Sequence, residues 1–127
     1  MKSYQKIPEY LLEDNIHAQI ISKLEEKLYS QNREITTEVK YSFIKKFGEI
    51  EKHEADIILI ANKYAYAIEV KTSDTIKARL KVKEQLKADK KFLSEKGIKK
   101  ILLFYAYQNK NPNLNNNKIY NMERLNL

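Results

Sequence analysis

Residues 55–71, ADIILIANKYAYAIEVK, read as two short apolar strands joined by a tight turn, and the rest of the chain is organised around this hairpin. With the turn centred on residues 62–63, Asp56 falls opposite Glu69, and directly opposed residues share one face of a sheet. Lys71 lies two residues beyond Glu69, so it belongs to the same face. Two opposed carboxylates repel each other, which predicts that a cationic group lies between them.

Both faces of the predicted hairpin are apolar. The face of Asp56 and Glu69 also carries Ile58, Ile60, Ala65 and Ala67, and the opposite face carries Ile57, Leu59, Tyr66, Ile68 and Val70. If the charged face were solvated, Glu69 and Lys71 would be ordinary surface residues. Two apolar faces instead predict a central hairpin that is covered on both sides, with its charges at the mouth of the core. Buried like charges persist only when they are paired or bound to a metal ion.

The composition is that of one compact globular domain, residues 1–127, with 43% apolar residues to form a core. The absence of cysteine excludes disulfides and cysteine-rich metal sites. The segment MKSYQKIPEYLLED contains no apolar signal core, and no apolar run approaches the ~20 residues of a membrane span. We therefore expect an intracellular, cytoplasmic protein that does not enter a membrane.

Hydrophobic periodicity and turn residues predict an α/β domain of order α-β-β-β-α-β, with a central mixed sheet flanked by helices. Outside the hairpin we expect a helix at 8–31, a strand at 34–44, a charged connection at 45–54, a helix from a cap at 72–74 to about Lys96, a strand at 98–107, an Asn-rich loop at 108–117 and a short terminal helix at 118–127. The strand at 98–107 is apolar throughout, which is typical of a buried strand with a parallel neighbour.

The first predicted helix carries an unusual acid on its apolar side. Ile16 and Ile20 begin an apolar stripe with a spacing of four residues, and Glu13 belongs to the same stripe. A glutamate seldom lies on the buried face of a helix, so Glu13 is a candidate site residue. His17 is also on this face, where a histidine more often serves as a core or capping residue than as a ligand.

The net charge of +7 is concentrated in one part of the chain. Residues 77–100 hold ten Lys or Arg against three Asp or Glu, a surplus of seven, and the rest of the chain is balanced. A basic stripe on a neutral body is typical of a nucleic-acid interface, although a solvated lysine-rich helix face would look the same. The candidate nucleic-acid-binding residues are Lys77, Arg79, Lys81, Lys83 and Lys87.

The charged end of the hairpin is suited to phosphodiester hydrolysis. Two carboxylates and a backbone carbonyl are hard oxygen ligands, which Mg²⁺ or Mn²⁺ prefers. Such an ion polarises the scissile phosphate and lowers the pKa of a bound water. A lysine two residues beyond the second carboxylate can orient that water or stabilise the negative charge that develops on the phosphate.

The pattern of Asp56, a short hairpin and then Glu69-Val70-Lys71 resembles the core of the PD-(D/E)xK nucleases, which have the restriction-endonuclease-like fold. The resemblance covers roughly residues 9–107 and includes the order of elements. Within the family, the chain is similar to archaeal Holliday junction resolvases and to small viral or mobile-element nucleases. It implies Asp56, Glu69 and the Val70 carbonyl as metal ligands, Lys71 as the catalytic lysine, and Glu13 as a further catalytic residue and metal ligand.

The chain departs from the family pattern at two places. Ala55 precedes the aspartate where the family often has proline, a position that shapes the turn rather than the chemistry. Gln85 stands in the following helix where some exonuclease-like members have a glutamine, but the tyrosine four residues later is replaced by Asp89. This substitution weakens an assignment to that branch, and Gln85 has a surface role as its alternative.

Two further accessory candidates have simpler alternative interpretations. Strict alternation in the strand at 34–44 places Ile35, Thr37, Val39, Tyr41 and Phe43 on one face and Glu38 on the other. Glu38 could be a second acidic site residue, but an exposed strand glutamate is more common. His53, three residues before Asp56, could contact phosphate, or it could be an exposed loop residue.

Taken together, the sequence predicts a deoxyribonuclease that depends on Mg²⁺ or Mn²⁺, binds DNA through its basic helix, and acts on DNA structure or ends rather than on a specific sequence. A homodimer, as in Holliday junction resolvases of this fold, would let two sites act on two strands. The alternatives are a nucleic-acid-binding module of the same fold without catalysis, and a protein whose basic helix binds an acidic partner.

Overall fold

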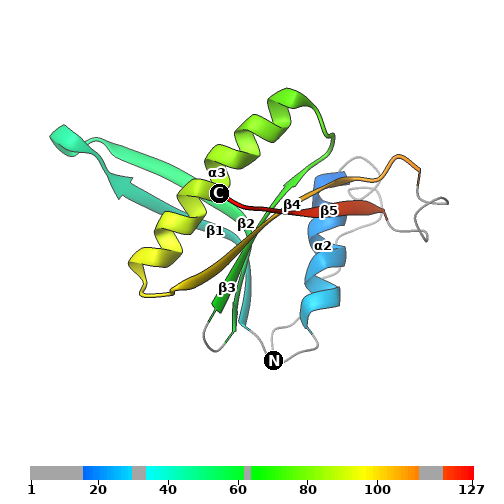
Figure 1. The fold of residues 1–127 in the computed structure, drawn as a ribbon, viewed down its shortest axis with the longest axis horizontal. Helices are drawn as coiled ribbons and strands as arrows, with labels where there is room; N and C mark the ends of the chain where they lie inside the picture. The colour runs from blue at the N-terminus through cyan, green and yellow to red at the C-terminus, as the bar shows by residue number, and fades with distance from the viewer. Residues whose placement is uncertain (1–15, 30–33, 62–63, 112–118) are drawn as a thin grey trace.

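The computed structural model describes residues 16–29, 34–61, 64–111 and 119–127, in which two helices and five strands form an α/β arrangement (Figure 1). In chain order the elements are α2 (Ile16–Tyr29), β1 (Glu34–Ile44), the 3-10 turn η1 (Lys46–Gly48), β2 (Ile50–Ala61), β3 (Tyr64–Lys71), α3 (Ile76–Glu95), β4 (Lys100–Gln108) and β5 (Tyr120–Leu125). Of the first helix, predicted at 8–31, residues 8–15 and 30–31 lie outside the described part. None of the helices in the described ranges is both long and apolar enough to span a membrane.

The five strands form one mixed sheet in the order β1-β2-β3-β4-β5. β3 and β4 are parallel, and the other neighbouring strands are antiparallel. Helix α3 connects the parallel pair. Such a connection is needed because β3 ends at one end of the paired strands and β4 starts at the other. The predicted α/β class, the mixed sheet and the parallel neighbour of the strand at 98–107 are therefore confirmed.

The hairpin of β2 and β3 has the register that its sequence predicts. Its pairs run from Ala61 with Tyr64 to Ile57 with Ile68. The ladder ends there, so Asp56 and Glu69 are the first residues beyond the last pair, at the open end of the hairpin. The turn residues 62–63 themselves lie outside the described part.

A helix covers each face of the hairpin, as two apolar faces require. Ala65 and Ala67 are fully buried on one face, in a cluster with Val82 and Leu86 of α3. Their short side chains let the helix pack close to the sheet. On the opposite face, Ile57, Ile68 and Val70 pack with Ile20, Ile21 and Leu24 of α2. The prediction of a central hairpin covered on both sides is confirmed.

The alternation of β1 reverses at Glu38, which the sequence did not predict. Glu38 has a backbone φ of 52°, in the left-handed region that non-glycine residues seldom adopt. Ile35 therefore packs with α2, whereas Tyr41 packs with α3, although strict alternation would place both on one face. The β1–β2 ladder has no Glu38–Asp56 pair. Asp56 thus lies where the sheet locally changes face.

The prediction of a charged connection at residues 45–54 is wrong. β2 begins at Ile50, and its first half pairs with β1 from Ile50 to Ala55, so that the two strands form a ribbon that extends beyond the helices (Figure 1). Phe47 and Gly48, both with positive φ, turn the chain between the strands. The charged residues of this strand have low strand propensity, and their pairing with β1 overrides it.

The predicted terminal helix at 118–127 is also wrong, because this segment forms β5 along β4. Two sets of contacts favour a strand over a helix in this segment. β4 offers an unpaired edge, and Glu123 of β5 accepts two hydrogen bonds from Arg79. Helix α3 has nearly the predicted bounds, but its cap is Thr75 rather than residues 72–74. The Thr75 hydroxyl accepts a hydrogen bond of 3.0 Å from the Ala78 backbone N–H.

Candidate functional site

Glu69 is a carboxyl group buried in the centre of the molecule. It lies near the end of β3, the middle strand of the sheet, and only 4% of it is exposed. Its Oε2 atom has no hydrogen-bond partner among the described residues. A buried oxygen without a partner is unfavourable, so this atom requires a proton or a cation beside it.

Asp89 of α3 is a second buried carboxyl group, which the sequence analysis did not include in the site. It is fully buried, and its Oδ1 atom accepts hydrogen bonds from the Tyr41 hydroxyl and, at 2.8 Å, from Gln85 Nε2. Its Oδ2 atom has no partner among the described residues. Asp89 belongs to the buried stripe Val82, Leu86, Asp89 and Leu93. That helical spacing was the signal that could have identified it.

Glu69 and Asp89 face each other across the interface between β3 and α3. Burial raises the pKa of Glu69 well above 4.5, and a hydrogen bond from its carboxyl group to Asp89 raises it further. Burial also raises the pKa of Asp89 above 3.8, although its hydrogen bonds with Glu69, Tyr41 and Gln85 act in the opposite direction. Two adjacent carboxyl groups cannot both be ionised in the core without a positive charge. This pair therefore holds either a shared proton or a cation.

Asp56 is the third carboxyl group of the cluster, and it is 14% exposed. Its Oδ2 atom accepts a hydrogen bond of 2.7 Å from the Val70 backbone N–H, which fixes it against β3 just beyond the last paired residues. Its charge contributes to the raised pKa of both Glu69 and Asp89. The open end of the hairpin thus brings together the two predicted carboxylates, although Asp56 and Glu69 are not a ladder pair.

The side chain of His17, which is cationic when protonated, lies next to Asp56. Its Nε2 atom lies 3.3 Å from Asp56 Oδ1. The hydrogen bond to Asp56 raises the pKa of His17 above 6.5, a hydrogen bond with the Val70 backbone acts in the same direction, and burial and the nearby charge of Lys71 lower it. The imidazole therefore contacts the two groups, Asp56 and the Val70 backbone, that the family resemblance assigns to a metal ion. Lys71 is half-buried beside it.

The donors of this cluster match a hard divalent cation in their chemistry. When both groups are ionised, Glu69 Oε2 and Asp89 Oδ2 are buried oxygens without a partner among the described residues, and oxygens of this kind are the ligands that Mg²⁺ or Mn²⁺ prefers. Within the described ranges, however, no three His, Cys, Asp or Glu side chains are arranged to hold a metal ion. The Asp56 carboxylate instead faces His17 and the Val70 N–H. Glu13, the other predicted ligand, lies outside the described residues.

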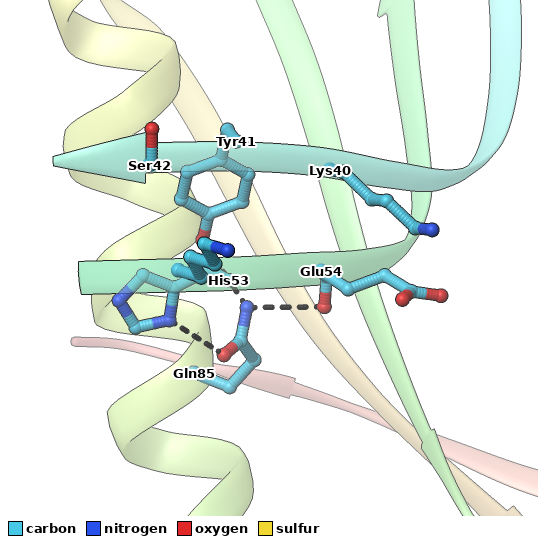
Figure 2. A pocket seen from close by; sticks show the side chains of 7 residues that line it. Lys40, Tyr41, Ser42, His53, Glu54 and Gln85 are labelled. Atoms are coloured by element: carbon cyan, nitrogen blue, oxygen red, sulfur yellow. Dashed lines mark hydrogen bonds between the residues drawn. The ribbon is translucent and has the colours of Figure 1, made fainter. Parts of the chain in front are cut away.

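A cavity of about 710 Å³ adjoins the cluster, lined by Lys40, Tyr41, Ser42, Lys52, His53, Glu54 and Gln85 (Figure 2). Gln85 lies at its inner edge, where its Nε2 atom donates to the Glu54 carbonyl at 3.2 Å and to the Tyr41 hydroxyl at 3.1 Å. Its Oε1 atom lies 3.0 Å from His53 Nδ1. Gln85 thus connects the cavity with Asp89. His53 lies on β2 rather than in a loop.

The predicted nucleic-acid-binding residues differ in how free they are to bind a partner. The lysines of α3 at positions 77, 81 and 87 are exposed, and Lys83 is half-buried. Arg79 is held by Asp74, at 2.9 Å, and by Glu123, at 2.8 Å. These two carboxylates raise the pKa of Arg79 and compensate its charge. The free basic surface of this helix is therefore formed by its lysines.

The remaining accessory candidates lie at the edges of the cluster. Glu38 is exposed and lies across from Asp56 in the register of β1 and β2, at the position where the ladder is interrupted. Gln85 is half-buried and contacts Asp89 rather than occupying a surface position. The structure therefore joins Gln85 and His17 to the cluster and leaves the Glu38 side chain in solvent.

The chain matches no protein-family model, no curated protein and no solved structure. The resemblance to the PD-(D/E)xK nucleases therefore depends on the motif Asp56, Glu69 and Lys71 and on the order of the elements.

Proposed function

We propose that the chain is a metal-dependent deoxyribonuclease that hydrolyses phosphodiester bonds at the open end of the β2–β3 hairpin. The observation that carries this proposal is the buried carboxyl pair Glu69 and Asp89, which the described residues do not neutralise with a positive charge, next to Asp56 and Lys71. Negative charge is unfavourable in a core and usually serves either a cation or a reaction. This cluster is the largest concentration of buried charge in the described residues, since the other buried polar residue among them is Asn109.

Each residue of the motif would have a separate role. Glu69, Asp56 and the Val70 carbonyl would hold Mg²⁺ or Mn²⁺, which polarises the phosphate and supplies a nucleophilic water at neutral pH. Lys71 would bind a phosphate oxygen through its ammonium group and stabilise the negative charge that develops on the phosphate. His17 would leave Asp56 when the cation arrives, because both positive groups require the same carboxylate.

The basic surface of α3 supports DNA as the substrate. The exposed lysines at positions 77, 81 and 87 would bind phosphates without reading the base sequence. With such contacts, DNA structure or DNA ends are the expected targets. A homodimer with two-fold symmetry would present two sites to two strands, as the cleavage of a four-way junction requires.

A second candidate, a nucleic-acid-binding module without catalysis, is favoured by two observations. No metal-holding group of three side chains occurs in the described ranges, and the raised pKa of Glu69 is that of a carboxyl group that keeps its proton. In that case the carboxyl pair would be a structural hydrogen bond, and the lysines of α3 would be the functional surface.

Cleavage assays separate the two candidates. Wild type and Glu69→Gln are incubated with single-stranded, duplex and branched DNA in Mg²⁺, Mn²⁺ or EDTA, and binding to the same DNA is measured in parallel by gel shift. We expect wild type to cleave at least one substrate only with a divalent ion, and Glu69→Gln to bind normally but to lose at least about 100-fold in rate. Binding by wild type without any cleavage would establish the non-catalytic module instead.

A further inference from the structure

The ribbon formed by β1 and β2 ends in an apolar tip, residues 44–50, that projects beyond both helices (Figure 1). Three large apolar side chains of this tip are exposed: Ile44 by 82%, Phe47 by 101% and Ile50 by 62%. Ile44 and Ile50 are a ladder pair, so they share one face of the ribbon. Apolar side chains that gather at one exposed place contribute nothing to the core and usually mark a binding surface.

Phe47, at the apex of the tip, has a backbone conformation that a bulky residue seldom adopts. Its φ is 68° and its ψ is 16°, in the left-handed region. Two backbone hydrogen bonds fix this turn, from the Lys45 N–H to the Glu49 carbonyl at 2.7 Å and from the Gly48 N–H to the Lys45 carbonyl at 3.2 Å. Glycine or asparagine would adopt this conformation at a lower cost, and the exposed ring adds no packing. The fold itself therefore gives no reason for phenylalanine here.

Lysines without an ion-pair partner lie along the same ribbon. Lys46 is at the tip, and Lys40 and Lys52 line the cavity of about 710 Å³ (Figure 2). All three are exposed, and none of them forms an ion pair with another described residue. Lys45, by contrast, lies 3.8 Å from Glu51 and compensates its charge. The free cations of the ribbon are thus available to an anionic partner.

The glutamates of the ribbon limit how much its charge alone can achieve. Residues 40–54 contain four lysines against three glutamates, so their surplus of positive charge is small. General attraction to DNA therefore comes mainly from the basic helix α3. The ribbon adds separate phosphate contacts beside an apolar tip, and this combination matches nucleic acid, whose phosphates surround apolar base faces.

The ribbon is continuous with the candidate site, because Asp56 lies on β2 six residues after Ile50. At about 3.3 Å per residue, the tip is roughly 20 Å from Asp56. This length corresponds to about six base pairs of duplex at about 3.4 Å each. A two-stranded ribbon fits the major groove, which is about 12 Å wide, and DNA-binding proteins insert apolar side chains such as phenylalanine between base steps.

We propose that the β1–β2 ribbon is a DNA-binding arm whose lysines contact phosphates and whose Phe47 ring stacks on a base where the base stack is interrupted. An intact step must first be unstacked, whereas a junction, a nick or an end already offers a free base face. The arm rests on the proposed function and names its substrate class, DNA with an interrupted stack. It holds the interruption about six base pairs from the carboxyl cluster.

The first test measures binding of the full chain in EDTA, where binding is separated from cleavage. Fluorescence anisotropy compares a four-way junction, a nicked duplex and an intact duplex of equal length. Phe47→Ala should weaken binding to the junction and the nicked duplex by about 5- to 100-fold and to the intact duplex by at most about threefold. Met122→Ala is the matched control, since Met122 is an exposed apolar residue on β5, the opposite edge strand. It should bind all three within about twofold of wild type.

A second readout reports the insertion itself. With 2-aminopurine placed at the nick, wild type should change the fluorescence of this base, and Phe47→Ala should not. Phe47→Trp should restore the change, and its own emission should be quenched by stacking. Thermal melting checks the fold: Phe47→Ala should melt at the wild-type temperature, because the ring is fully exposed.

The lysines are tested by salt dependence. Replacing both Lys40 and Lys52 with alanine should reduce the slope of log affinity against log salt by up to about 1.8 on all three DNAs. The charge-matched control replaces Lys99 and Lys100, which are exposed and precede or begin β4 at the end of the sheet far from the candidate site. An equal reduction in both double variants would show that only the overall charge matters and would overturn the role of the arm in phosphate binding.

The outcomes separate the arm from the proposed nuclease. If wild type cleaves DNA but Phe47→Ala binds the junction and the nicked duplex like wild type, the arm is wrong and the nuclease stands. If binding depends on Phe47 but no metal ion supports cleavage, the arm stands and the nuclease fails. If sedimentation shows that Phe47→Ala converts a dimer to a monomer, the tip is a contact between copies of the chain, and the arm is overturned.

Discussion

Replacing Glu69 with glutamine should remove a pH dependence from the stability of the metal-free protein. Burial and the contact with Asp89 raise the pKa of Glu69 above 4.5 in the fold, so the folded state keeps a proton that the unfolded chain releases. The stability that this proton provides is complete below pH 4.5 and is lost as the pH rises toward the folded pKa. Stability should therefore fall with increasing pH.

The size of this effect follows from the linkage between protonation and folding. While Glu69 stays protonated in the fold, each pH unit above its unfolded pKa costs about 1.4 kcal/mol. Between pH 5.0 and pH 6.5 the free energy of unfolding should fall by about 2 kcal/mol, a large part of the roughly 5–15 kcal/mol that stabilises a domain. Because Glu69 is only 4% exposed, solvent screens this effect little. The raised pKa of His17 acts with the same sign but mainly above pH 6.5.

Urea unfolding, followed by circular dichroism in EDTA at pH 5.0 and pH 6.5, measures this effect. Relative to wild type, Glu69→Gln should lose the decrease of about 2 kcal/mol, because glutamine does not titrate and can still donate to Asp89. Glu84→Gln should retain the wild-type decrease, since Glu84 is exposed. Equal pH dependence of wild type and Glu69→Gln would refute the claim that Glu69 carries a buried proton in the metal-free fold.

Three further predictions concern other parts of the chain. His17→Ala should tighten Mn²⁺ binding by about fourfold or more at pH 6 and by much less at pH 8. The reason is that an imidazole with a pKa above 6.5 is mostly charged at pH 6 and then competes with Mn²⁺ for the Asp56 carboxylate. Calorimetry at both pH values measures this, and weaker Mn²⁺ binding by the variant at pH 6 would contradict it. Replacing both Lys77 and Lys81 with alanine should weaken DNA binding at low salt and reduce the slope of log affinity against log salt by up to about 1.8, and an unchanged slope would exclude these lysines as phosphate contacts. Thr75→Ala should cost about 1 kcal/mol in urea unfolding through loss of the helix cap, whereas Thr75→Ser should cost little; an equal loss in both variants would argue against the cap.

The parts of the fold that local patterns determine could be predicted from the sequence. The alternation of apolar residues and a two-residue turn set the register of the β2–β3 hairpin, and this register brought Asp56 and Glu69 to one end of it. The bounds of the strand at 34–44 also agree with its local pattern, helix α3 follows its periodicity, and Gly97, with a φ of 86°, ends the helix as expected.

The parts that tertiary contacts decide could not be predicted. β5 forms because β4 offers an unpaired edge, and the charged start of β2 is a strand only because β1 pairs with it. The positive φ of Glu38 has no glycine to mark it. Asp89 lies among the many lysines of the basic helix, although its spacing from Leu86 and Leu93 marks it as buried. The position of one acidic residue within the apolar stripe of α3 was therefore informative, but a count of charges over residues 77–100 does not show it.

Anomalous scattering from crystals grown with Mn²⁺ tests the central claim most directly, because it locates the ion itself. We predict one peak beside the Glu69 and Asp56 carboxylates, at about 2.0–2.2 Å from its oxygen ligands, with His17 displaced from Asp56. Crystals of Glu69→Gln should lack this peak. If wild-type crystals contain no ion at this position, and Glu69 still contacts Asp89 with His17 on Asp56, the carboxyl cluster is structural and the proposed metal site is wrong.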